Sequence, residues 1–206
     1  MTAIQINQLT LDEVIGQFQL VETTDLDFFS EWQGELPEID DRTQEDLDRI
    51  KANYAYLSRK SLDEGVVKLV VLGRLLSLAG FYEPPFRLIT EKAVQISAVD
   101  EDQIFRGMVD ILAMHEKVWV LLVEAKHNRF SLEPALPQAL AYMSAAPYPD
   151  YPTFGLITNG QNFLFLKMLN QVYGTSKEFA MRNPGDLTQV LQVMRRLGEI
   201  VRSWEV

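Results

Sequence analysis

The chain has 206 residues, of which 47% are hydrophobic and 23% are charged, as is usual for soluble globular proteins. It has no cysteine, which excludes disulfides, cysteine zinc sites and thiol redox chemistry, and only two histidines, which argues against a site built on imidazole groups. A metal ion would then be a hard cation held by carboxylates. Mg²⁺ is the first choice, and Mn²⁺ is the alternative.

The formal net charge of −10 argues at first against a nucleic-acid partner, because phosphate binding usually leaves a basic surface. The charge is unevenly distributed, however. Residues 1–64 carry 15 acidic and 5 basic side chains, which leaves 14 of each sign in residues 65–206. The acidic excess is therefore confined to the N-terminal third, and the rest of the chain can still present a local basic surface.

No apolar run approaches the roughly 18 residues that a membrane helix needs. The N-terminal sequence MTAIQINQLTLDEV lacks the basic stretch and apolar stretch of an export signal. We therefore expect a cytoplasmic protein without a membrane segment.

Residues 1–41 mix short apolar stretches with many acids and predict strand-and-turn fragments packed on a main domain. Apolar residues spaced by three and four predict an amphipathic helix over 41–60, with Asp41 or Thr43 as its cap. A second helix is predicted from Ser61 to Leu78. Ser61 and Glu64 have the spacing of a capping box, and Gly80 would end this helix.

The pattern changes after Pro84-Pro85. Three strands are predicted over 86–96, 104–114 and 118–125, separated by polar turns at 100–102 and 115–117. A helix over 132–146, two strands (153–158 and 163–168) around Asn159-Gly160 and a helix over 186–204 follow. This order predicts an α/β (α+β) fold with a central mixed sheet flanked by helices. We expect residues 1–60 to form an acidic N-terminal extension with a helix, and residues 61–206 to form the core domain.

The segment Val118 to Lys126 carries the strongest chemical signal. Six apolar residues predict a buried strand, and Glu124 and Lys126 follow at a spacing of two, which places both side chains on one face. Asp110 lies in the apolar run of the preceding strand. If the connecting turn is centred on Lys117, Asp110 lies opposite Glu124, with Cβ atoms about 4.5–5.5 Å apart.

Two partly buried carboxylates at that separation repel each other unless a cation lies between them. Mg²⁺ bound by Asp110 and Glu124, with the Ala125 carbonyl as a further ligand, would leave room for a phosphate and an attacking water. Lys126 would position that water or offset charge on phosphorus.

An acidic residue two positions before a lysine is expected about once by chance in this composition, and Glu124-Ala-Lys126 is the one instance in the chain. The alternative is an exposed ion pair at the end of the strand, with Asp110 capping a turn. The position of Glu124-Ala-Lys126 at the end of the most apolar strand favours a functional site over this alternative.

Four elements occur in order: Arg106-x-x-x-Asp110, Glu124-Ala-Lys126, Gln138-x-x-x-Tyr142 and Leu156-Ile-Thr-Asn-Gly160. Together, over residues 62–170, they resemble the N-terminal nuclease domain of the restriction (R) subunit of type I restriction enzymes, in the PD-(D/E)XK nuclease superfamily. The resemblance implies a restriction-endonuclease-like core in which Asp110, Glu124 and Lys126 bind metal and catalyse. It also implies that Gln138 and Tyr142 support activity and that Glu64 joins the metal site.

Each of the added residues has a structural alternative. Glu64 suits a capping box, Gln138 suits any polar helix position, and His127 points away from the face of Lys126. Arg106 shares strand parity with Asp110 and would reach a phosphate or form a surface ion pair.

The function expected from these observations is a Mg²⁺-dependent deoxyribonuclease that hydrolyses phosphodiester bonds. The alternative is a non-catalytic module of the same fold that binds nucleic acid or a protein through the acidic N-terminal segment. Beyond DNA, a second copy of the chain, forming a homodimer, is an expected partner. A separate translocase or specificity subunit is another. The sequence has no G-x-x-x-x-G-K-[ST] phosphate loop, so an ATP-driven translocase would be a different chain.

Overall fold

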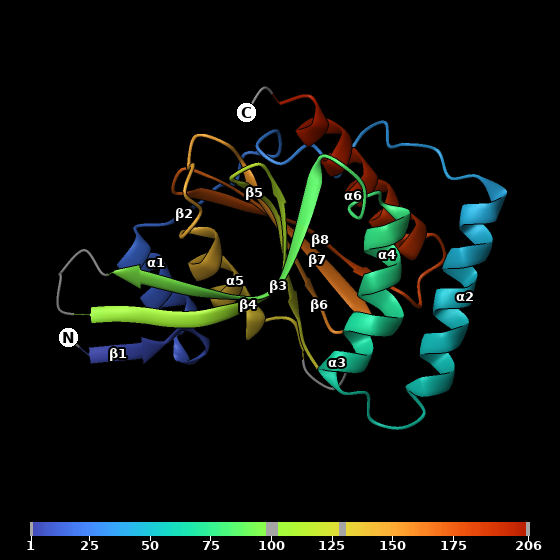
Figure 1. Ribbon diagram of the computed structural model, residues 1–206, viewed down its shortest axis with the longest axis horizontal. Coiled ribbons are helices and arrows are strands. Elements are labelled where there is room, and N and C mark those ends of the chain that lie inside the picture. Colours follow the sequence, from blue (N-terminus) through green and yellow to red (C-terminus); the bar gives the residue numbers. More distant parts are fainter. Residues whose placement is uncertain (1, 98–102, 128–130, 205–206) are drawn as a thin grey trace.

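The computed structural model describes residues 2–97, 103–127 and 131–204, and arranges them as one mixed sheet with helices on both faces (Figure 1). In these residues the sheet has eight strands, in the order β1-β4-β5-β6-β7-β8-β2, with β3 on the other edge of β4. The strands are β1 (Thr2–Gln5), β2 (Val21–Glu22), β3 (Phe86–Ser97), β4 (Gln103–His115), β5 (Val118–Ala125), β6 (Thr153–Thr158), β7 (Asn162–Leu169) and β8 (Val172–Ala180). The predicted fold class, a central mixed sheet flanked by helices, is confirmed.

Strand β4 organises the half of the sheet that carries the predicted site. One edge of β4 pairs antiparallel with β3 along nearly its whole length. On the opposite edge, β1 pairs in parallel with residues 103–106, and β5 pairs antiparallel with residues 111–115. The two partners therefore follow one another along one edge, and residues 107–110 lie between them.

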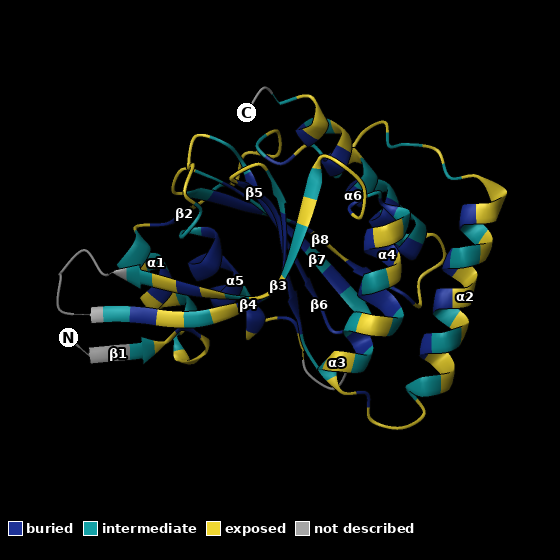
Figure 2. Cartoon of the chain, in the orientation of Figure 1, coloured by how far each residue is buried: buried dark blue, intermediate teal, exposed yellow. Residues whose placement is uncertain are grey.

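The helices form two layers. They are α1 (Leu11–Phe18), α2 (Asp41–Leu57), α3 (Glu64–Val67), α4 (Gly73–Leu78), α5 (Ala135–Met143) and α6 (Asp186–Arg202), with a π-helical turn, η2 (Lys68–Leu72), between α3 and α4 and a 3-10 turn, η1 (Ile6–Gln8), before α1. Helices α2, α3, α4 and α6 share one hydrophobic core, whereas α1 and α5 share the core on the other face. Figure 2 shows the buried central strands β5 and β6 between these layers. Within the described ranges, none of the helices has the length and apolar character needed to cross a bilayer.

The predicted helix over 41–60 is confirmed, because α2 buries Leu47, Ile50 and Tyr54 along one face. Its cap differs from the prediction. The side chain of Asp40 accepts the Thr43 N–H at 2.7 Å, so Asp40 takes the place that Asp41 or Thr43 was expected to fill.

The second predicted helix is present but starts differently. Asp63 precedes α3, and Ser61 does not form the predicted capping box, because its hydroxyl instead shares a hydrogen bond of 2.8 Å with His127 Nε2. Gly80 follows α4 with a φ of 80°, a conformation that glycine adopts at no steric cost, and it ends the helix as predicted.

The predicted strands over 86–96, 104–114, 118–125, 153–158 and 163–168 all occur, although the expected turn at 100–102 lies outside the described residues. Two elements were missed. The first is β8, which pairs with β7 and whose alternation is interrupted by small and polar residues. The second is α1. Thr10 and Glu13 form its capping box, and their spacing in the sequence could have predicted the start of this helix.

Residues 1–60 contribute two strands to the common sheet. Strand β1 pairs with β4, and β2 pairs with β8, in both cases in parallel. The first strand thus lies on the same edge of β4 as the site-bearing strand β5. The proposed division into an extension and a core stays a prediction.

Candidate functional site

Strand β5 carries Glu124, and Lys126 directly follows its last residue. The strand is buried along its entire length, between β4 and β6, because six consecutive apolar side chains fill the two cores that cover its faces. Glu124 is also buried, with 2% of its surface exposed. Its Oε1 accepts a hydrogen bond of 2.9 Å from Lys126 Nζ, so the two side chains lie on one face as the spacing predicted.

Helix α5 closes the site from the same side. Gln138 donates through Nε2 to Glu124 Oε1 at 2.6 Å and accepts through Oε1 from Lys126 Nζ at 2.9 Å. Its Nε2 also lies 3.1 Å from the hydroxyl of Tyr142, one helical turn later, and that hydroxyl accepts the Met108 N–H at 3.0 Å. This chain of bonds joins Lys126 to the backbone of β4 and restricts the positions that its ammonium group can take.

A glycine makes this contact between α5 and β4 possible. A Cβ atom at Gly107 would lie 2.6 Å from Tyr142 Cε1, closer than carbon atoms approach one another. The ring of Tyr142 therefore packs directly over the backbone of β4 beside Met108.

Asp110 joins the site from β4. Its Oδ2 accepts the Ala125 N–H at 2.8 Å, and its side chain is 13% exposed. The last ladder pair is Ile111 with Val123, and one step further this register sets Asp110 opposite Glu124, as predicted. A bulge between Ala113 and Met114 reconciles this register with the tight turn at 116–117.

The structure adds a residue that was not predicted. Lys68, the first residue of the π-helical turn, places its Nζ 2.5 Å from Asp110 Oδ1 and 3.0 Å from Glu64 Oε1. Glu64 therefore lies near the site through this ion pair and does not act in a capping box. Its spacing of four from Lys68 on a predicted helix was the signal that could have pointed to the pair.

Burial dominates the electrostatics of the carboxylate on β5. Desolvation raises the pKa of Glu124 to about 8; Lys126 opposes the shift, and the charges of Asp110 and Glu64 add to it. Burial lowers the pKa of Lys68, but Asp110 and Glu64 outweigh that effect and hold it above its usual value. Without a further cation, the site thus favours a protonated Glu124 and a charged Lys68.

The site offers a carboxylate oxygen to a hard divalent cation but no cluster of three ligands. Glu124 Oε2 is buried and has no hydrogen-bond partner among the described residues, so this oxygen is available as a ligand. In the same part of the chain, no three His, Cys, Asp or Glu side chains gather closely enough to hold a metal ion, so Glu64, Asp110 and Glu124 do not form a ready-made cluster. Mg²⁺ commonly uses one or two carboxylates and completes its shell with water, which this pair allows.

The other predicted residues lie apart from these bonds. Arg106 is exposed on β4, where its backbone pairs with Gln5 and Gln95. His127 hydrogen-bonds to Ser61 and links the end of β5 to the start of α3.

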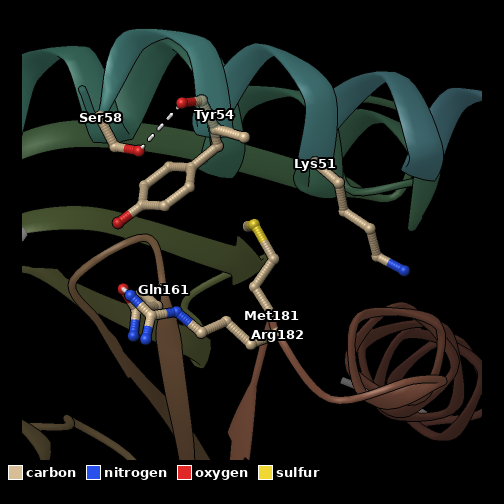
Figure 3. Close-up of a pocket in the computed structure, with 7 residues that line it drawn as sticks. Lys51, Tyr54, Ser58, Gln161, Met181 and Arg182 are labelled. Carbon is tan, nitrogen blue, oxygen red and sulfur yellow. Dashed lines mark hydrogen bonds between the residues drawn. The ribbon is translucent and has the colours of Figure 1, made fainter.

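Two hollows lie near this part of the fold. A cavity of about 600 Å³ borders Lys68 and Asp110 and has an apolar wall that includes Leu69, Tyr82 and Leu88. A second pocket, of about 350 Å³, lies between α2, the β6–β7 turn and the residues after β8 (Figure 3). Figure 3 shows Lys51 and Tyr54 on its α2 side and Gln161 and Arg182 facing them. Of these two hollows, the first is lined by a predicted site residue, Asp110.

The chain is similar in structure to a protein of known structure, but not in sequence to a known family. No family model matches the chain, and no curated protein matches it. Among solved structures, it is similar to the fragment of a putative HsdR subunit of a type I restriction enzyme from Vibrio vulnificus YJ016, at 16% identity and a TM-score of 0.44. The match covers 65% of this chain and 26% of that chain.

Proposed function

We propose that this chain is a Mg²⁺-dependent nuclease that hydrolyses DNA phosphodiester bonds. The observation that carries the proposal is the convergence of Asp110, Glu124, Lys126 and Gln138 at the end of β5. Within the part of the chain that the structure describes, one buried carboxylate oxygen of Glu124 has no partner there. Burial of a carboxyl group with an unpaired oxygen lowers the stability of the fold, and a structural role alone does not explain it.

Each residue has a distinct part in the proposed reaction. Asp110 and Glu124 would hold the cation, with the Ala125 carbonyl as a further oxygen ligand and Glu64 as an additional acid beside them. Bound Mg²⁺, or Mn²⁺ in its place, lowers the pKa of a coordinated water and neutralises charge on the scissile phosphate. Lys126 orients the attacking water and stabilises negative charge that develops on the phosphoryl oxygens.

Gln138 acts as a positioning residue. Because Gln138 bonds to both Glu124 and Lys126, the ammonium group of Lys126 is shared between the Glu124 carboxylate and the Gln138 amide. Tyr142 holds Gln138 in place through its own bond to the Met108 amide. This support keeps the catalytic groups in one arrangement before substrate arrives, which is the condition for electrostatic catalysis.

The proposal extends to DNA as substrate and to a type I restriction context in which a translocase or specificity subunit is a separate chain. A homodimer is a further proposed assembly. The balanced charge of residues 65–206 is compatible with a local phosphate-binding surface.

The decisive experiment incubates supercoiled plasmid with the protein in Mg²⁺ or Mn²⁺, with and without a chelator. Wild-type protein is expected to nick or linearise the plasmid only when the cation is free. Glu124→Gln should abolish this activity, whereas Glu45→Gln, which removes the same charge from the exposed face of α2, should retain it. DNA binding without cleavage by the wild type would favour the non-catalytic module instead.

A further inference from the structure

Lys68 lies where a cation is expected in the proposed site. Its ammonium nitrogen contacts Asp110 Oδ1 at 2.5 Å and Glu64 Oε1 at 3.0 Å, and both acids belong to the proposed metal-binding set. The group is 26% exposed, so the pair is partly shielded from water. An ion pair in this setting is stronger than one on the open surface.

A π-helical turn begins at Lys68, the residue that contacts Asp110. The N–H of Lys68 still bonds back to Glu64 and Gly65, but the following residues form a π-helical turn before α4 resumes regular geometry. Single π turns are rare and occur often at functional sites, because the extra residue changes the direction of the side chains around it. Here the turn leaves Leu69 77% exposed, an unfavourable position for leucine, while Lys68 points to the carboxylates.

An ammonium group held at Asp110 Oδ1 opposes the binding of a divalent cation to the same carboxylate. At such short separations two cations repel strongly, and the partial burial of the site reduces the screening by water. Binding of a divalent cation therefore favours departure of the ammonium group from Asp110.

The fold provides space for this exchange. Lys68 and Asp110 border the cavity of about 600 Å³, whose wall includes Leu69, Tyr82 and Leu88. The aliphatic stem of lysine packs well on apolar surface while its ammonium group extends to water. Lys68 can thus leave Asp110 without unfolding the helix that carries it.

We infer that Lys68 is a built-in competitor for the metal site: it neutralises Asp110 and Glu64 in the metal-free protein and yields Asp110 to the incoming divalent cation. This inference rests on the proposed metal site. Lys68 would then set the cation concentration at which the site fills. Lys126 has a different role, because it stays bonded to Glu124 and Gln138.

The test measures Mn²⁺ binding by isothermal titration calorimetry to the full chain without DNA. Lys68→Met keeps the length of the side chain and removes its charge, so its dissociation constant is expected to fall by roughly tenfold relative to the wild type. Lys51→Met is the matched control, because it removes the same charge from α2 at a side chain 3.9 Å from its nearest acid. The control should bind Mn²⁺ as the wild type does.

The outcomes separate the two proposals. Equal or weaker Mn²⁺ binding by Lys68→Met than by the wild type overturns the role of Lys68 but leaves the metal site standing. Absence of Mn²⁺ binding in both proteins overturns the metal site and this inference together. Binding by Lys68→Met alone supports the inference in its strongest form.

A second measurement covers the case in which Lys68→Met does not fold. Nitrogen-15 NMR of lysine ammonium groups in the wild type reports Lys68 directly, and Lys68→Arg identifies its signal by the absence of that signal. Titration with Mg²⁺ is expected to shift the Lys68 signal as the ammonium group leaves Asp110. A Lys68 signal that does not move across the titration overturns the inference.

Discussion

The backbone N–H of Ala125 donates a hydrogen bond of 2.8 Å to Asp110 Oδ2. A carboxylate on β4 is thus tied to β5 at the residue between Glu124 and Lys126, just where the ladder between the two strands ends. The bond fixes the orientation of the carboxylate. Asp110 therefore has a structural contact beside its proposed role in metal binding, and the two can be separated by mutation.

Asp110→Asn should separate them, because asparagine still offers an oxygen to the Ala125 amide but carries no charge. DNA cleavage is expected to fall by a factor on the order of 10² or more. Asp110→Ala should lose cleavage equally and, since it leaves the amide without a partner, should be about 1–3 kcal/mol less stable than Asp110→Asn. Plasmid cleavage and urea unfolding measure the two effects. Full activity in Asp110→Asn would remove Asp110 from the proposed metal site.

Lys126→Ala distinguishes catalysis from binding. A lysine that stabilises charge mainly in the transition state contributes to turnover more than to affinity, so cleavage should fall by a factor on the order of 10² while Mn²⁺ and DNA still bind. Lys117→Ala, in the exposed turn between β4 and β5, is the control with the same change of charge. If Lys126→Ala cleaved like the control, the ion pair with Glu124 would be structural only.

The free energy of unfolding should depend on pH through Glu124. Burial raises its pKa to about 8 from an ordinary value of 4.5, so between these values the folded protein holds a proton that the unfolded chain releases. The contribution of Glu124 to stability is therefore fullest below about pH 4.5 and is lost as the pH rises through about 8. Urea unfolding across this range should show a steeper decline for the wild type than for Glu124→Gln, which does not titrate. Parallel profiles would contradict the raised pKa.

Divalent cation should bind more tightly as the pH rises. A metal ion takes the deprotonated carboxylate, so binding below about pH 8 must release the proton of Glu124. The thermal stabilisation by Mg²⁺ is thus expected to increase from about pH 6 to about pH 8 and to be absent in Glu124→Gln. A Mg²⁺ effect of equal size in that variant would show that the cation binds elsewhere.

Gly107→Ala tests the contact between β4 and α5. The added methyl group would meet the ring of Tyr142 at 2.6 Å from Cε1, so the ring must move away from Met108 and weaken the hold on Gln138. We expect a loss of about 1–3 kcal/mol in stability together with reduced cleavage. Gly16→Ala, on α1 with nothing within 4 Å of the new Cβ, should lower neither stability nor cleavage. Activity and stability equal to that control would show that Tyr142 is not held by this contact.

Local patterns were enough to predict the part of the site that lies on the strand pair. The apolar run before Glu124 predicts a buried strand, and the alternation of side chains along a strand puts Glu124 and Lys126 on one face. The opposition of Asp110 and Glu124 also followed, because a hairpin links register to the position of its turn. The structure adds a bulge near Ala113 that compensates for a turn centred differently from the prediction.

Contacts between elements far apart in the chain were beyond such patterns. The bonds from Gln138 to Glu124 and Lys126 depend on where α5 crosses the sheet, which packing of its apolar face decides. Lys68, at the start of a π-helical turn, reaches Asp110, 42 residues later. Helix and strand periods are set by neighbouring residues, whereas these contacts are selected by the burial of whole faces against one another.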